Sequence, residues 1–398
     1  MTALAFNPID LDKVADPYPL FARIRDGGAV QRLENGFWMV SGHAAALEAL
    51  HHDECRSGPI AMRYVDGLPP GAARDEMSHR INFLDPPDHP RVRGLVSKAF
   101  TPRRIAMLKP WIEETAARLC SQLASRPEFD LLHEFAHQVP SLVISELLGV
   151  PPADRDLLTR WSDEVAPLLG LEVSPEQKAG AIAAAEEFHG YLGSLLDDRA
   201  RHPGEDLLSA LLAAEADGER LARVELLSLA ATLYSAGHRT TRDLFTNGMS
   251  VLLSKPERYR DVVDGRSSIP AVIEEFLRFE TPTLFVVRVP FEKVTIGGVE
   301  IGAFEPILVF LSAANHDGAA FEAPDEFRPG RGGPMALSFA FGAHYCLGAS
   351  LARSEAEVML AAVTSTWPDL ALAPGRELRW HQRGPFRGLD ELWVTTGR

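Results

Sequence analysis

The chain has 398 residues, a formal net charge of −15, 46% hydrophobic residues and 24% charged residues. This composition is ordinary for a soluble globular protein, and the acidic balance argues against nucleic acid as a partner, because phosphate binding needs clustered cations. No segment approaches the roughly 18–20 consecutive apolar residues that a membrane helix needs, and residues 1–16 do not resemble a signal peptide. The cysteines, Cys55, Cys120 and Cys346, are odd in number and widely separated. They do not suggest a disulfide framework, and we expect a cytoplasmic protein without a membrane partner.

Local patterns predict mostly helix. Near the N-terminus, Val30–Leu33 and Trp38–Val40 predict a short hairpin across Asn35-Gly36. Apolar residues at helical spacing predict helices over Pro110–Ser125, Pro140–Leu148, Pro175–Arg199, Arg223–Leu253 and Ile269–Phe279. Further strands are predicted at Val294–Gly297, Val299–Ile301, Pro306–Phe310 and Glu391–Thr396. Because no linker or internal repeat separates two cores, we expect a mainly α protein with small β-sheets, in one domain over residues 1–398.

A run of cations stands out from the acidic background. Arg91, Arg93, Lys98, Arg103 and Arg104 fall within fourteen residues that contain no acid. Two interpretations remain open: a solvated helix face, or a docking patch for an acidic electron carrier.

The predicted helix Arg223–Leu253 carries an unusual central segment, Ala236-Gly237-His238-Arg239-Thr240-Thr241. Glycine in a helix interior costs about 1 kcal/mol relative to alanine. We expect a local widening there, which would let Thr240 present its hydroxyl to a groove instead of its own helix. The alternative is that a neighbouring element packs closely on Gly237.

Cys346 has the most informative surroundings in the chain. It lies in a glycine-bracketed loop, Phe339–Gly348, that leads directly into a helix-forming stretch, Ala349–Ala362. A thiolate there would lie near the positive end of the helix, and Gly342 and Gly348 would permit a tight bend and close approach of a flat partner. Such a site suits axial ligation of haem iron by a thiolate. The alternative is a buried structural cysteine.

This loop resembles the haem-binding signature of the cytochrome P450 family, F-x-x-G-x-[HR]-x-C-x-G, at Phe339, Gly342, His344, Cys346 and Gly348. The resemblance extends over nearly the whole chain. It implies a cytochrome P450 fold with a long central helix over the haem. The implied cofactor is haem b (iron protoporphyrin IX), held through Cys346 as metal ligand, with Gly348 beside it.

Other segments match the same family. Ala236, Gly237 and Thr240 match its oxygen-binding motif, [AG]-G-x-[DE]-T, which implies that Thr240 is the dioxygen-activating threonine. Arg239 departs from the motif because it occupies the position of the acid. Arg239 could pair with Asp243 one turn later, bind a substrate carboxylate or phosphate, or leave proton delivery to His238 or the substrate.

The resemblance also implies supporting residues. Glu275 and Arg278 form an E-x-x-R pair that would join Arg331 in a buried network. The haem propionates would be held by His89, Arg93, Arg288 and His344. The substrate pocket would be lined by Thr232, Ser235, Ala236, Leu284, Val286 and Phe386.

The implied function is a bacterial-type monooxygenase that inserts one oxygen atom from O2 into a small organic substrate, in secondary metabolism. Catalysis would depend on Thr240, Arg239 and Cys346. A ferredoxin and its reductase would supply electrons, since no flavin or nicotinamide fingerprint accompanies the haem motifs. Two alternatives remain: oxidative coupling or another tailoring step, on a substrate that could be carrier-bound, and a haem-binding protein without turnover.

Overall fold

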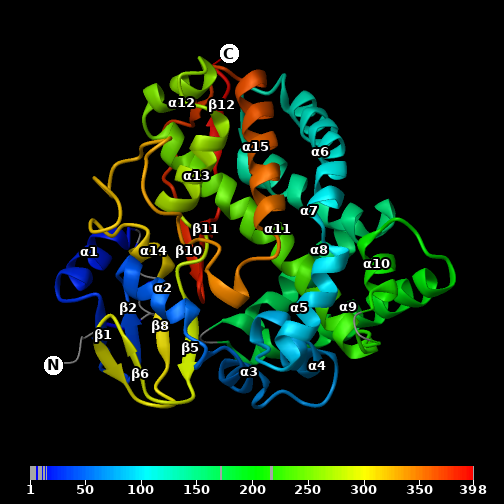
Figure 1. The fold of residues 1–398 in the computed structure, drawn as a ribbon. Coiled ribbons are helices and arrows are strands. Elements are labelled where there is room, and N and C mark those ends of the chain that lie inside the picture. Colours follow the sequence, from blue (N-terminus) through cyan, green and yellow to red (C-terminus); the bar gives the residue numbers. More distant parts are fainter. Residues whose placement is uncertain are drawn as a thin grey trace. The chain divides into compact units, whose positions relative to one another are not determined.

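The computed structural model describes residues 6–7, 11, 14, 16–170, 173–215 and 218–397 (Figure 1). Within these residues the chain is mainly α-helical with small sheets, as the sequence predicts. The chain divides into two compact units. The first comprises Met1–Arg56, Pro110–Val139 and Thr240–Arg398, and the second comprises Ser57–Lys109 and Pro140–Arg239. The single domain over residues 1–398 stays a prediction.

The strands that the structure describes all belong to the first unit. Its largest sheet has the order β1 (Val30–Arg32), β2 (Trp38–Val40), β8 (Ile307–Val309), β5 (Val286–Pro290) and β3 (Cys55–Arg56). The smaller sheets pair β6 (Val294–Ile296) with β7 (Val299–Ile301), β10 (Trp380–Arg383) with β11 (Phe386–Leu389), and β12 (Trp393–Thr395) with both β4 (Glu128–Asp130) and β9 (Ala371–Leu372). The predicted β1–β2 hairpin is confirmed, with Val30 opposite Val40.

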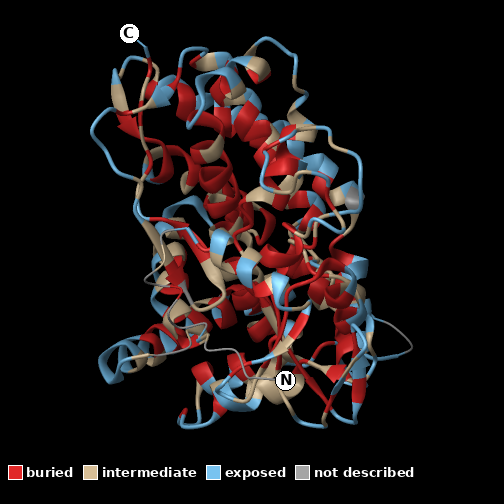
Figure 2. Cartoon of the chain, turned by 90° about the vertical axis from the view of Figure 1, so that its left-hand side faces the viewer, coloured by how far each residue is buried: buried red, intermediate tan, exposed pale blue. Residues whose placement is uncertain are grey.

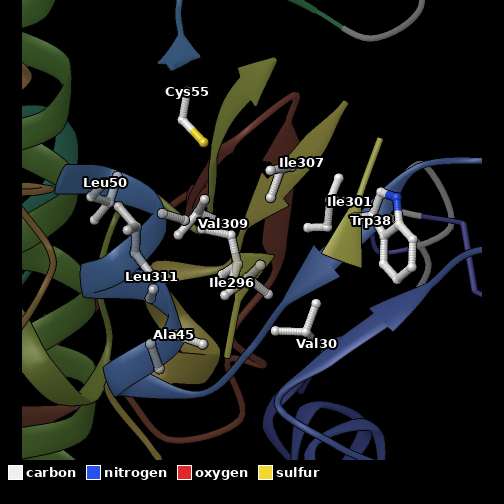
Figure 3. Close-up of a cluster of buried hydrophobic side chains, with 14 of the residues drawn as sticks. Val30, Trp38, Ala45, Leu50, Cys55, Ile296, Ile301, Ile307, Val309 and Leu311 are labelled. Carbon is white, nitrogen blue, oxygen red and sulfur yellow. The ribbon is translucent and has the colours of Figure 1, made fainter. Parts of the chain in front are cut away.

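A hydrophobic cluster joins the largest sheet to helix α2 (His43–His51) in the first unit (Figure 3). Val30, Ile307 and Val309 contribute from strands, and Ala45 and Leu50 contribute from α2. The cluster also includes Leu337 and Ala340, and Phe341 packs against it. Leu337 lies just before the Cys346 loop, and Ala340 and Phe341 lie at its start. Burial of this apolar surface therefore anchors the start of that loop.

The remaining helices of the first unit are α1 (Tyr18–Asp26), η3 (Leu132–Ala136), α12 (Pro256–Val263), α13 (Ile269–Phe279), α14 (Leu311–Ala314), η6 (Gly342–His344) and α15 (Ala349–Thr366). The second unit contains α3 (Gly58–Val65), α4 (Ala72–His79), η2 (Ile81–Phe83), α5 (Asp88–Ala99), η4 (Pro152–Asp154), α8 (Arg155–Val165), η5 (Ala166–Leu169), α9 (Pro175–Arg201) and α10 (Leu207–Ala213). Three helices have residues in both units: α6 (Pro102–Leu123), α7 (Gln138–Leu147) and α11 (Arg223–Leu253).

Two predicted helix starts were wrong. Helix α6 begins at Pro102, eight residues before the predicted start, and contains Pro110 in its interior. The reason is that its buried stripe already begins at Ile105 and continues through Ile112 and Ala116 at helical spacing. Helix α7 begins two residues early, at Gln138. The predicted bounds of α11 and α13 are confirmed.

Buried and exposed residues alternate along the helices with helical periodicity (Figure 2). Amphipathic helices of this kind bury one face and leave the other to solvent. Among the described residues, no helix combines the length and the apolar character needed to span a bilayer.

Gly248 in α11 tests how tightly this helix packs on α13. A Cβ at Gly248 would lie 2.1 Å from Cδ2 of Phe276. We expect Gly248→Ala to lower the free energy of unfolding by about 1–3 kcal/mol through overpacking, measured by urea denaturation. Gly190 in α9 is a matched control, because a Cβ there meets nothing within 4 Å. Gly190→Ala should raise stability by about 0.5–1 kcal/mol, and equal effects of the two changes would contradict the close packing.

Candidate active site

The loop that carries Cys346 is closed by backbone hydrogen bonds. The N–H of Cys346 donates to the carbonyl of Phe339 at 3.0 Å, and the N–H of Tyr345 donates to the carbonyl of Gly342 at 3.0 Å. Cys346 is exposed, whereas Cys55 and Cys120 are buried. Burial raises the pKa of both of those thiols to about 11. Cys346 is therefore the cysteine that the fold exposes, and the alternative of a buried structural cysteine was wrong.

The glycines of the loop have different roles. Gly342 has a φ of +73°, and a Cβ there would lie 2.6 Å from the carbonyl oxygen of Leu50 at the end of α2. Only glycine satisfies both conditions, so the loop can approach the backbone of α2 closely. Gly348 precedes the first residue of α15, and a Cβ there would meet nothing within 4 Å. The chain itself therefore leaves open space at Gly348, two residues after Cys346.

The predicted network around Glu275 is confirmed. Glu275 and Arg278 are each 2% exposed. Arg278 donates to both carboxylate oxygens of Glu275, from Nε at 3.0 Å and from Nη2 at 2.8 Å. Arg331 donates from Nε to the same two oxygens at 3.2 and 3.0 Å, and the backbone N–H of Arg328 adds a bond at 2.7 Å. The buried carboxylate is thus surrounded by donors, which offsets much of its desolvation cost.

Asn315 connects this network to the Cys346 loop. Arg278 Nη1 donates to the Asn315 carbonyl at 2.9 Å. The Asn315 side chain in turn accepts from the N–H of Leu337 at 2.7 Å and donates to Oγ of Ser338 at 2.9 Å. Ser338 immediately precedes Phe339, whose carbonyl holds the Cys346 N–H. A continuous hydrogen-bonded path therefore runs from α13 to the loop.

Arg353 of α15 also positions the loop, and sequence reasoning missed it. Its guanidinium lies 4.7 Å from the centre of the Phe339 ring and pairs with Glu274 of α13. Its place one turn into α15, the helix that directly follows the Cys346 loop, was the signal that could have identified it.

Strand β5 and hairpin β10–β11 carry further candidate residues of the first unit. Arg288 is buried on β5, opposite Ile307, and one of its donors is used on the carbonyl of Val287 at 2.9 Å. Val286 and Phe386 are partly exposed, whereas Leu284 is fully buried. The N–H of Leu284 donates to the carbonyl of Pro385 at 2.7 Å, so the structure brings the segments of Leu284 and Phe386 together. In this conformation Leu284 offers no surface to a ligand.

Helix α11 does not widen at its glycine. It is α-helical throughout Arg223–Leu253, so the predicted widening was wrong. The physical reason is packing: a Cβ at Gly237 would lie 3.0 Å from Cδ1 of Ile144. The alternative, a neighbour packed on Gly237, is supported. Thr240 is partly buried, and Ala236, one turn before it on the same face, is exposed.

Arg239 has an acidic neighbour that sequence reasoning did not find. Its Nε lies 3.7 Å from Oδ1 of Asp163 in α8. The same oxygen lies 3.5 Å from Nε2 of His238, whose Nδ1 lies 3.0 Å from the carbonyl of Tyr234. Asp243, the partner suggested by helical spacing, pairs with Arg242 at 2.7 Å. Asp163 lies too far along the chain to have been found from local spacing.

The second unit holds the remaining candidates. His89 is buried and Arg93 is partly buried; they lie four residues apart on α5 and therefore share a face. Ser235 is partly exposed, and Thr232 is buried. His344, in η6 of the first unit, is partly buried.

Much of the basic run has partners within the second unit. Arg91 pairs with Glu225, Arg104 donates to the carbonyl of Glu205, and Lys98 donates to the carbonyl of Glu215 at 3.0 Å. These contacts agree with the solvated-face interpretation, and the docking patch stays a prediction.

Comparison with known proteins decides the family. The family model described as cytochrome P450 matches residues 267–367. A vitamin D(3) 25-hydroxylase from Pseudonocardia autotrophica is 36% identical over 391 residues, which cover 96% of this chain and 94% of the relative. The chain belongs to the cytochrome P450 family.

Other cytochrome P450 proteins are similar over most of their length. A mycinamicin IV hydroxylase/epoxidase from Micromonospora griseorubida is 40% identical over 83% of this chain and 85% of the relative. The structure of P450BioI in complex with an acyl carrier protein ligated to hexadec-9Z-enoic acid has a TM-score of 0.87 and 31% identity, and covers 98% of this chain and 100% of that one. The chain is accordingly an oxidoreductase of the cytochrome P450 monooxygenase class, and its cofactor is haem b.

The residues present fit this cofactor. Cys346 is exposed, and its loop is connected to α13 by hydrogen bonds through Asn315. Because there is open space at Gly348, Cys346 can offer a thiolate to iron. Arg288 and His344 in the first unit, and His89 and Arg93 in the second, are cationic or hydrogen-bonding groups of the kind that bind carboxylates.

Glu275 provides a test of the hydrogen-bonded path. We expect Glu275→Gln to lower the free energy of unfolding by about 3–5 kcal/mol, because it leaves the buried Arg278 and the partly buried Arg331 without their carboxylate. Urea denaturation measures this. Glu274→Gln changes the adjacent residue, whose pair with Arg353 is half exposed, and should cost at most about 1 kcal/mol. A small loss for Glu275→Gln would show that the network does not support the fold.

Proposed function

We propose that the protein inserts one oxygen atom from O2 into a small organic substrate, by hydroxylation or epoxidation, in secondary metabolism. The observation that carries this proposal is the exposed Cys346, in a loop anchored to α13, in a chain related over most of its length to a hydroxylase and a hydroxylase/epoxidase. Haem bound through Cys346 would supply the activation of O2 and the transfer of one oxygen atom.

The residues of the chain would provide position and protons. His89, Arg93, Arg288 and His344 would bind the propionates and orient the ring. The Thr240 hydroxyl, which can both donate and accept a hydrogen bond, would relay protons consumed when O2 is reduced. Val286, Phe386, Ser235 and Ala236, which are partly or fully exposed, would contact the substrate. Thr232, which is 5% exposed, would border that surface, and the fully buried Leu284 would lie behind it.

The contact of Arg239 with Asp163 bears on its role. A guanidinium that already lies beside a carboxylate has less charge to offer a second anion. This disfavours binding of a substrate carboxylate by Arg239. We infer that Arg239 pairs with an acid of the protein and that water carries protons to Thr240.

Electrons would arrive from a ferredoxin and its reductase. Cytochrome P450 relatives use O2, small substrates and redox partners.

A second candidate is oxidation of a carrier-bound substrate, because P450BioI was crystallised with a loaded acyl carrier protein. Titration of the ferric protein with free small molecules, and then with the same acyl groups on a carrier protein, would separate the two. A spin-state change with free molecules supports the first proposal, and a change only with the loaded carrier supports the second.

The thiolate ligand is tested by the absorption spectrum of the reduced protein with carbon monoxide. We expect the long-wavelength Soret band of a thiolate-ligated haem in the unchanged protein and its loss in Cys346→Ser. Cys55→Ser and Cys120→Ser are matched controls, because both thiols are buried. Retention of the band in Cys346→Ser would refute the assignment of the ligand.

Thr240→Ala distinguishes a catalytic enzyme from a protein that binds haem without turnover. We expect an unchanged carbon monoxide spectrum but a drop of about tenfold or more in product formed per reductant consumed, since proton relays contribute factors of this size. Thr241→Ala is the neighbouring control. Equal coupling in Thr240→Ala and the unchanged protein would remove the role proposed for Thr240.

A further inference from the structure

A buried polar cluster lies in the second unit, and sequence reasoning did not anticipate it. Glu76 of α4 is 1% exposed, Arg80 is 4% exposed and His189 of α9 is 8% exposed. One carboxylate oxygen of Glu76 pairs with Arg80 at 2.5 Å, and the other lies 3.1 Å from Nε2 of His189. The hydroxyl of Ser228 in α11 donates to the carbonyl of Glu76 at 2.9 Å. Helices α4, α9 and α11 of this unit are thus joined at Glu76, α9 through its carboxylate and α11 through its backbone carbonyl.

The cluster ends at Ser235 of α11. Nη2 of Arg80 donates to Oγ of Ser235 at 3.5 Å, and Oγ of Ser235 donates to the carbonyl of Thr232 at 3.2 Å. Ser235 is partly exposed and its neighbour Ala236 is exposed, although both lie in the middle of a 31-residue helix. The buried cluster therefore leads to an accessible surface of α11.

The hydrogen-bonding capacity of Ser235 is restricted by these contacts. A serine hydroxyl has one donor and two acceptor positions. Here the donor is used on Thr232 and one acceptor position receives Arg80, so one acceptor position remains. Ser235 is thus prepared to accept a hydrogen bond from a ligand.

Thr232 adds a complementary group one turn before Ala236. It is 5% exposed, and within the described part of the chain its Oγ1 has no hydrogen-bond partner. A buried hydroxyl left without a partner is costly, and a ligand group that reached it would remove this cost. Its hydroxyl can donate a hydrogen bond to a ligand oxygen.

The charges around this site balance. The positive charge of Arg80 is paired with Glu76, and that of Arg239 lies beside Asp163. A carboxylate ligand at Ser235 would therefore meet guanidinium groups that already have acidic partners, and it would pay its own desolvation cost. A neutral hydroxyl, which donates once and accepts, matches the groups present.

We propose that Ser235 and Thr232 form a polar subsite that binds a neutral hydroxyl group of an otherwise apolar substrate. The substrate hydroxyl donates to Ser235 and accepts from Thr232. Arg80 is a positioning residue that orients the Ser235 hydroxyl, and Glu76 and His189 hold Arg80. This inference rests on the proposed function, because it places the substrate beside α11.

The test uses azoles, which bind haem iron directly and so give a spectral titration whatever the natural substrate is. The probes are phenylimidazole, its ortho, meta and para hydroxyphenyl isomers, and the matching methoxyphenyl and carboxyphenyl compounds. We expect at least one hydroxyphenyl isomer to bind about three- to tenfold more tightly than phenylimidazole, the range of one or two neutral hydrogen bonds. The methoxy and carboxylate compounds should show no such gain, because neither donates to Ser235.

Substitutions show which residues cause the higher affinity for hydroxyphenyl compounds. Ser235→Ala and Thr232→Val should each reduce the ratio of hydroxyphenylimidazole affinity to phenylimidazole affinity to near one. Ser228→Ala is the matched control: it removes a serine of the same helix and cluster, seven residues away, and should keep the preference. The double change Glu76→Gln with Arg80→Gln, which leaves no unpaired charge, should weaken the preference at unchanged phenylimidazole affinity.

Three results would overturn the inference: no preferred hydroxyphenyl isomer, a preference for the carboxylate, or a preference that survives Ser235→Ala. Failure of the proposed function has a different signature. In that case phenylimidazole itself gives no spectral shift and the reduced protein shows no thiolate band with carbon monoxide.

Discussion

The position of Cys346 depends on one buried carboxylate. Glu275 accepts from Arg278, Arg331 and the backbone of Arg328, and these bonds hold the segment before the loop against α13. Arg278 also donates to the carbonyl of Asn315, and the side chain of Asn315 donates to Ser338, so these bonds extend to the residue before Phe339. A buried ion pair of this kind contributes little net stability, but breaking it is costly, and this asymmetry favours one geometry over others. Rigid support of a single ligand residue is what a cofactor held through one protein bond requires.

Helix α11 provides the second constraint. Its regular geometry sets the spacing of Thr232, Ala236 and Thr240, which recur every four residues on one face. The glycine beside this face does not interrupt the helix; it admits Ile144. A regular, tightly packed α-helix keeps polar groups at constant positions, whereas a widened one would let them shift. The hydroxyls of this face are therefore preorganised.

Electrostatics in the second unit favour neutral ligands. The buried guanidinium of Arg80 has its pKa lowered by burial, and the adjacent Glu76 opposes that shift. Arg239 lies beside Asp163 in a comparable way. A guanidinium that already has an acidic partner adds little net charge to its surroundings, but it can still orient a neighbouring group by donating a hydrogen bond to it. An apolar molecule with a hydroxyl group fits such surroundings better than an anion does.

The sequence by itself determined the local elements and the ligand loop. Helix and strand periods depend on neighbours within a few residues, and they predicted α11, α13 and the β1–β2 hairpin correctly. The Cys346 loop could likewise be predicted from the sequence, since its glycines and the helix that follows it are local features. Tertiary structure decided the rest. Asp163 and Arg239 are separated by 76 positions in the sequence, and Glu76 and His189 by 113. Only folding brings each pair together, because no local pattern encodes which distant side chains will become neighbours. The same holds for Gly237, whose effect on its helix was determined by the neighbour that packs on it and not by its own propensity.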